Sequence, residues 1–167
     1  MTEPGLGYVG RTFINFKDNS FRWIDLKEFH IPVGLSAEDA LRQLLEHARY
    51  RDHYTSEDSH EHDSESLHGP YELRHIEADS FELVDEQQAI DLVRGFTRAY
   101  GDPGVEVLDE IDRVVYPVIR GSGVRYRLRD LGQEALHDFG WVLRDFTELV
   151  LIDPANNREV LLVAAID

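Results

Sequence analysis

The stretch from Val160 to Ile166 constrains the fold of this chain more than any other segment. All seven of its residues are apolar, so neither face of a strand built from them suits contact with water. A strand that is apolar on both faces belongs at the centre of a sheet. The turn-forming DPANN at 153–157 precedes it, and TELVLI at 147–152 precedes that turn. These residues predict a C-terminal hairpin whose last strand is central.

Further hairpins are predicted where turn residues separate segments rich in aromatic and β-branched side chains. The turn clusters are Lys17–Ser20 and Arg120–Gly123. Because Pro117 cannot donate to a β-ladder, its strand is expected at an edge of the sheet. The expected pairs are 8–16 with 21–26 and 113–119 with 124–129, together with short strands at 71–76 and 81–84.

Two helices are predicted from their N-terminal caps and from apolar residues at helical spacing. Ser36 and Asp85 each stand three residues before an acidic or amide side chain, which is the pattern of a capping box. The expected helices cover 37–51 and 86–99. The Asp-Pro-Gly at 102–104 fits either a helix start or a turn, and we expect a helical or irregular stretch that ends near Asp112.

The predicted fold class is α+β. Because the strands are joined as hairpins rather than through helices, we expect a mostly antiparallel sheet with two main helices packed on one face. The length of 167 residues fits a single domain over 1–167. Residues 52–70 contain one aliphatic side chain, Leu67, and no periodicity, which predicts a mobile acidic and histidine-rich loop.

Acidic charge is concentrated in residues 36–86. The chain has 33 acidic and 17 basic residues, and this segment alone has 15 against 4, a net charge of −11. Such a field repels nucleic acid and anionic lipid and attracts cationic proteins, although acidity across the whole chain also fits a background property of the source organism. The predicted binding carboxylates are Glu38, Asp39, Glu46, Glu57, Asp58, Glu61, Asp63 and Glu65.

Histidines among these carboxylates raise the alternative of a metal site. Imidazole and carboxylate ligands suit a divalent metal such as zinc or nickel, and the candidate ligands are His60, His62 and Asp63. His60-Glu61-His62-Asp63 misses the H-x-H-x-D-H pattern of binuclear metallohydrolases by one position. A solvated loop is the favoured interpretation.

Three other patterns carry less weight. Gly5–Gly10 matches G-x-G-x-x-G, but a strand-like segment follows it where the dinucleotide fingerprint needs a helix. Ser122 lies between two glycines without the G-x-S-x-G context, so we expect a turn. The row Arg125, Arg127 and Arg129 suits either an anionic ligand or, as we favour, ion pairs with a neighbouring strand.

Three hypotheses for function follow. The first is an acidic protein-interaction module that neutralises a cationic partner such as a nuclease toxin, as an immunity protein does. The second is a metal-binding protein or metal-dependent enzyme, which is less favoured because no catalytic motif has its required context. The third is a structural domain that forms a homodimer through the strand around Pro117 or the C-terminal hairpin. The absence of cysteine, of a membrane-length apolar run and of a secretory pattern in MTEPGLGYVG leads us to expect a cytoplasmic protein.

Overall fold

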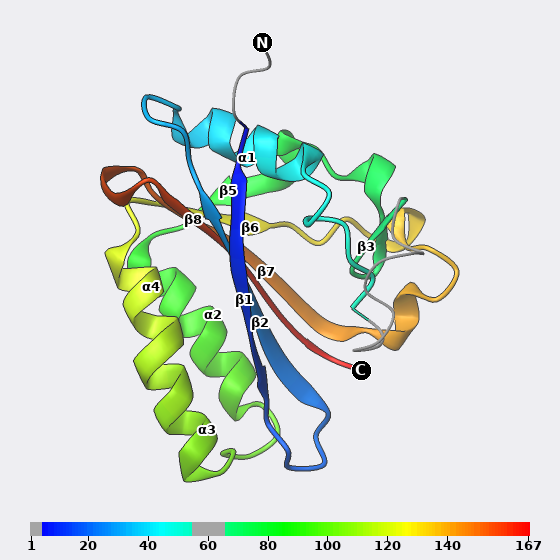
Figure 1. Ribbon diagram of the computed structural model, residues 1–167. Helices are drawn as coiled ribbons and strands as arrows, with labels where there is room; N and C mark the ends of the chain where they lie inside the picture. The colour runs from blue at the N-terminus through cyan, green and yellow to red at the C-terminus, as the bar shows by residue number, and fades with distance from the viewer. Residues whose placement is uncertain (1–4, 55–65) are drawn as a thin grey trace.

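The computed structural model describes residues 5–54 and 66–167. Its centre is a six-stranded antiparallel sheet in the order β1-β2-β8-β7-β6-β5, and a two-stranded sheet pairs β3 with β4. Helices pack on both sides of the large sheet (Figure 1). The predicted α+β class and the mostly antiparallel sheet are confirmed, and so are the hairpins β1–β2 and β7–β8.

The elements have the following bounds. The strands are β1 (Gly7–Asn15), β2 (Arg22–His30), β3 (Leu67–His68), β4 (Tyr71–Glu72), β5 (Phe81–Leu83), β6 (Val124–Leu128), β7 (Arg144–Asp153) and β8 (Arg158–Ile166). The α-helices are α1 (Ala37–Glu46), α2 (Glu86–Arg98), α3 (Val105–Glu110) and α4 (Tyr116–Gly121). A π-helical turn, η3 (Ile111–Val115), joins α3 to α4. Short 3-10 turns are η1 (Leu73–His75), η2 (Ala78–Ser80), η4 (Gln133–Ala135), η5 (Gly140–Val142) and η6 (Pro154–Asn156).

Strand β8 is central, as its unbroken apolar run predicts. It pairs with β2 on one side and with β7 on the other. Its side chains alternate between two separate hydrophobic clusters. Leu161, Val163 and Ala165 belong to the first cluster, and Val160, Leu162 and Ala164 belong to the second. One strand therefore supplies both cores.

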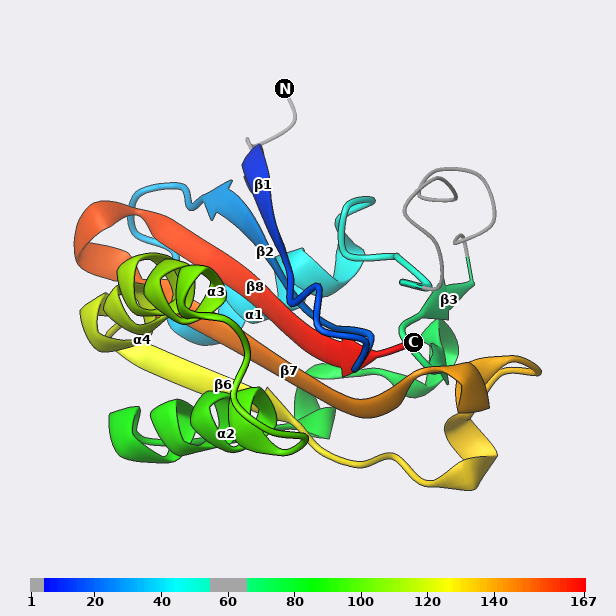
Figure 2. The ribbon, with the colours of Figure 1, turned by 90° about the horizontal axis from the view of Figure 1, so that it is seen from below.

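The two predicted helices lie on opposite faces of the sheet, which corrects the expectation that they share one. The apolar face of α1 enters the first cluster through Leu41 and Leu44, whereas α2 enters the second through Ile90 and Val93. Figure 2 shows α2, α3 and α4 together on the side of the sheet away from α1. Local caps fix where each helix starts but carry no information about which face it covers.

The predicted caps are confirmed. The Ser36 side chain accepts a hydrogen bond of 3.1 Å from the amide of Asp39, and Asp85 forms a capping box with Gln88. Helix α1 ends at Glu46, earlier than predicted, because His47 is extended and its amide bonds back to the carbonyl of Leu44.

The segment predicted as strand 113–119 is helical, and this is the largest correction. Ile111, Val115 and Ile119 recur every four residues and are buried against the sheet, so helical packing overrides their β propensity. Pro117 lies in the first turn of α4, directly after the π-helical turn η3. The dimerisation edge expected around Pro117 does not exist. The C-terminal hairpin is internal as well, since the edge strands are β1 and β5.

Both ends of the predicted mobile loop 52–70 are buried, which corrects part of that expectation. Asp52, His53 and Tyr54 are buried at its start, and His68–Pro70 are buried at its end. The strand expected at 71–76 is limited to β4, after which the chain turns through η1. Residues 55–65 lie outside the described residues.

Candidate functional site

Helix α1 presents the first three predicted binding carboxylates on its outer face. Glu38, Asp39 and Glu46 are exposed, because the buried face of the helix uses Ala40, Leu41 and Leu44. Arg42 lies between them and pairs with Glu38 at 2.7 Å and with Asp39 at 3.5 Å. Within the described chain, Glu46 forms no ion pair.

The short turn η2 packs beside α1 and adds two carboxylates. Glu77 and Asp79 are exposed, and neither has an ion pair with another described residue. They are not among the predicted binding residues, and the sequence shows 77–80 only as the connection between two short strands. We define the α1 surface as Glu38, Asp39, Glu46, Glu77 and Asp79. The charge of this surface also affects a residue of β6. The pKa of Tyr126 is raised, mainly by burial and secondly by the nearby charge of Glu38.

The other predicted binding residues cannot be placed against this surface. Glu57, Asp58, Glu61, Asp63 and Glu65 lie outside the described residues, and so do the candidate metal ligands His60 and His62.

A buried ion pair fixes the chain that follows α1. Lys27 of β2 points its ammonium group to Asp52 Oδ2 at 3.0 Å, to the Tyr54 hydroxyl at 3.1 Å and to the Arg49 carbonyl at 3.2 Å. Burial acts to raise the pKa of Asp52, but Lys27 and the Tyr54 amide overcome this and lower it. The sheet therefore holds residues 49–54 through a charged group inside the first cluster.

A second buried group fixes the same segment to β7 and to the β3–β4 hairpin. The His68 ring stacks on the Tyr50 ring with centroids 3.7 Å apart. Its Nδ1 lies 2.5 Å from the Tyr50 carbonyl, and its Nε2 contacts the carboxylate of Glu148. The Tyr50 hydroxyl donates to the same carboxylate at 2.7 Å. Since a carbonyl oxygen only accepts hydrogen bonds, Nδ1 of His68 carries a proton.

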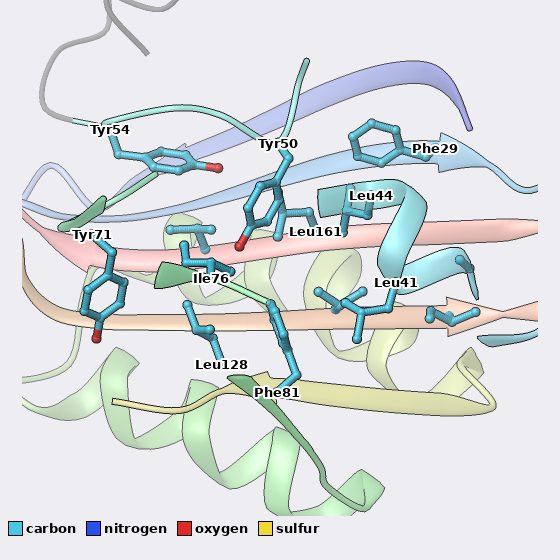
Figure 3. Close-up of a cluster of buried hydrophobic side chains, with 14 of the residues drawn as sticks. Phe29, Leu41, Leu44, Tyr50, Tyr54, Tyr71, Ile76, Phe81, Leu128 and Leu161 are labelled. Carbon is cyan, nitrogen blue, oxygen red and sulfur yellow. The ribbon is translucent and has the colours of Figure 1, made fainter. Parts of the chain in front are cut away.

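These three side chains have no access to solvent. Tyr50, His68 and Glu148 are at most 1% exposed. Burial, with the Glu148 charge second, raises the pKa of Tyr50 well above its ordinary value. Figure 3 shows Tyr50 and Tyr54 entering the first cluster from the segment that follows α1. In this arrangement they join the segment after α1 to β7 and to the β3–β4 hairpin.

Two further acidic side chains are buried in the sheet. Asp25 of β2 accepts a hydrogen bond from Arg11, while its Oδ2 has no hydrogen-bond partner in the described chain. Burial raises the pKa of Asp25 against the opposing charges of Lys27 and Arg11. Glu159 of β8 has no partner for either oxygen among the described residues, and burial raises its pKa to about 9. In the sequence, Glu148 and Glu159 each stand directly before the apolar run of their strand.

The remaining sequence candidates have structural roles. Arg127 and Arg129 reach Glu82 of the neighbouring strand β5 at 3.9 and 3.7 Å, which confirms the predicted ion pairing for these two residues. Arg125 instead reaches Glu86 of helix α2 at 3.6 Å. The Ser122 hydroxyl donates to the Val118 carbonyl at 2.7 Å at the end of α4. It lies at the close of a helix rather than in the predicted hairpin turn.

Over residues 5–54 and 66–167, no three His, Asp or Glu side chains converge in a way that could hold a metal ion. The zinc or nickel hypothesis concerns residues beyond those ranges and stays a prediction. None of the helices in the described part of the chain combines the length and apolar character that crossing a membrane requires.

Comparison with known proteins finds no relationship. No protein-family model matches the chain, and searches of curated proteins and of solved structures return no significant match. The case for a function therefore rests on the surfaces of the chain itself.

Proposed function

We propose that this protein is an interaction module that binds a cationic protein through the α1 surface. The observation that carries the proposal is the placement of five exposed carboxylates on two adjacent elements, α1 and η2. Among the residues that the structure describes, Arg42 is the cation that forms ion pairs with these carboxylates, and it reaches Glu38 and Asp39 alone. Most of this surface is therefore available to arginines and lysines of a partner.

The buried groups beneath this surface support the proposal. Lys27 and His68 hold the chain after α1 against the sheet, so the helix and its flanking segment need little ordering when a partner binds. A preformed acidic surface on a chain of net charge −16 attracts a cationic partner over long range and accelerates association. A nuclease, whose active site gathers arginine and lysine to hold phosphates, is the class of partner that suits this chemistry.

Charge reversal at positions that lack an ion pair tests the proposal. Untagged protein is isolated from its own cells at low salt, and any bound cationic protein is identified by native mass spectrometry. The affinity of that partner is then measured for the wild type and for Glu46→Lys/Glu77→Lys/Asp79→Lys. We expect the triple variant to bind at least about tenfold more weakly, since each lost charge pair contributes up to ~1 kcal/mol.

A matched control separates the α1 surface from net charge. Glu106→Lys/Asp109→Lys/Asp112→Lys makes the same change in charge on exposed positions of the α3–η3 segment, across the sheet. We expect this control to keep near wild-type affinity at moderate salt. Equal losses in the two variants would show that only net charge matters, and no loss in the first would refute the α1 surface as the site.

A further inference from the structure

An open cleft of about 530 Å³ lies on the face of the sheet opposite α1. Its volume falls in the usual range for small-molecule sites. One wall is the helical segment formed by η3 and α4, and the other is the edge of the sheet at β1 and β2. Figure 2 shows α3 and α4 alongside β8 on this side of the molecule. The lining residues used below are Gly10, Thr12, Leu26, Arg113, Arg158 and Val160.

Two backbone irregularities shape the cleft. The helical wall passes through a π-helical turn at η3, which carries Arg113. The β1–β2 register shifts between Tyr8 and Gly10, and a Cβ built on Gly10 would meet nothing within 4 Å. π-helical turns and β-bulges both concentrate at functional sites. The space beside Gly10 is open, so a ligand can approach the backbone there.

The base of the cleft is apolar and its rim is cationic. Leu26 and Val160 form part of the second cluster and are nearly fully buried. Arg113 is exposed and forms no ion pair within the described chain. Arg158 contacts, through its Nε atom, the carboxylate of Glu28, which also lines the cleft. Arg11 also lines the cleft, but its guanidinium engages Asp25. In a chain of net charge −16, a local excess of cationic groups over an apolar base is selective for an anion.

We propose that this cleft binds a small organic anion, whose carboxylate or phosphate contacts Arg113 and Arg158 while an apolar body covers Leu26 and Val160. This site is separate from the proposed protein-binding surface, which lies on the other face of the sheet. Its ligand class follows from two requirements that the lining imposes together: a negative head group and an apolar tail.

Calorimetric titration with four probes tests both requirements. Decanoate and decyl phosphate carry a charge and a chain, decanol has the chain without the charge, and acetate has the charge without the chain. All are used below their aggregation concentrations. We expect one molecule of decanoate or decyl phosphate to bind per protein, at least about tenfold more tightly than decanol or acetate, because only these two probes combine a charged head group with an apolar chain. The tighter of the two anions identifies the head group.

Three variants place the binding in the cleft. Arg113→Gln removes the unpaired guanidinium and should weaken decanoate binding about tenfold. Arg120→Gln makes the same charge change at an exposed position of α4 outside the cleft, and should bind as the wild type does. Thr12→Trp fills the cleft from an exposed position on edge strand β1 and should abolish binding. Thermal melting confirms that each variant is folded.

The proposal is overturned by any of three results. These are the absence of saturable binding of either anion to the wild type, equal affinity for decanol and decanoate, and unchanged affinity in folded Arg113→Gln. None of these results bears on the cationic partner, because that site uses residues on the other face.

Discussion

Lys27 and Asp52 form an ion pair 3.0 Å long in which both side chains are at least 93% buried. Removal of one partner leaves an uncompensated charge in the first cluster. We expect Lys27→Met to lower the free energy of unfolding by about 3–5 kcal/mol. The double variant Lys27→Met/Asp52→Leu should recover a large part of this loss, since it leaves no buried charge unpaired. Urea unfolding of the wild type, the two single variants and the double variant measures the coupling, and strictly additive losses would contradict it.

Glu159 should make the protein less stable at high pH. Its pKa is about 9 in the folded chain against an ordinary value of 4.5, so the folded state binds more protons between these values. Its contribution to stability is fully present below 4.5 and is lost as the pH rises to about 9. Glu159→Gln, which cannot ionise, should reduce the decline in stability over this range by several kcal/mol. Urea midpoints at several pH values compare the two proteins, and parallel pH profiles would rule the idea out.

The hydroxyl of Tyr50 should contribute measurably to stability. It donates to Glu148 inside the first cluster, so Tyr50→Phe leaves a buried carboxylate with one fewer hydrogen bond. We expect a loss of about 1–3 kcal/mol in denaturant unfolding. Tyr126→Phe is the control, because Tyr126 is half-buried and its hydroxyl has no hydrogen bond with the described residues. That variant should change stability by less than about 0.5 kcal/mol.

Two glycine-to-alanine substitutions should act in opposite directions. Gly95 lies in the exposed interior of α2, where a Cβ meets nothing within 4 Å, so alanine should stabilise by up to about 1 kcal/mol. Gly140 is buried, and a Cβ there would overlap the carbonyl of Pro70. We expect Gly140→Ala to destabilise by about 1–3 kcal/mol, since backbone must move to admit the methyl group. Thermal melting of the two variants measures both effects, and a stabilised Gly140→Ala would contradict the packing described here.

The sequence predicts correctly those parts of the fold that depend on neighbouring residues in the chain, such as helix caps and buried strands. The cap at Ser36 and the apolar run of β8 were interpreted correctly, because a capping hydrogen bond and two-sided burial leave direct traces in the residue pattern. The prediction of a strand at 113–119 is wrong because the three valines of this segment and Ile119 have high β propensity. Only packing against the sheet selects the helix.

The candidate site was predicted in part for a related reason. Glu38, Asp39 and Glu46 follow from the charge pattern, but Glu77 and Asp79 join them only because η2 packs against α1. Asp52 and His68 belonged to a segment whose composition is that of a solvated loop. Their burial depends on Lys27 and Glu148, which are distant in sequence, so composition alone gave no sign of it.

Strand β8 connects the hydrophobic clusters on the two faces of the sheet, because its alternate side chains pack into one cluster and then the other. If either cluster opens fully, β8 loses packing on one face, and the other cluster depends on that same strand. The two layers should therefore unfold as one cooperative unit, with no state in which α1 is detached and the α2 side is intact. The amide hydrogens of Leu161–Ala164 should then exchange with solvent only through complete unfolding, which makes them the slowest-exchanging reporters of the stability of the whole sheet.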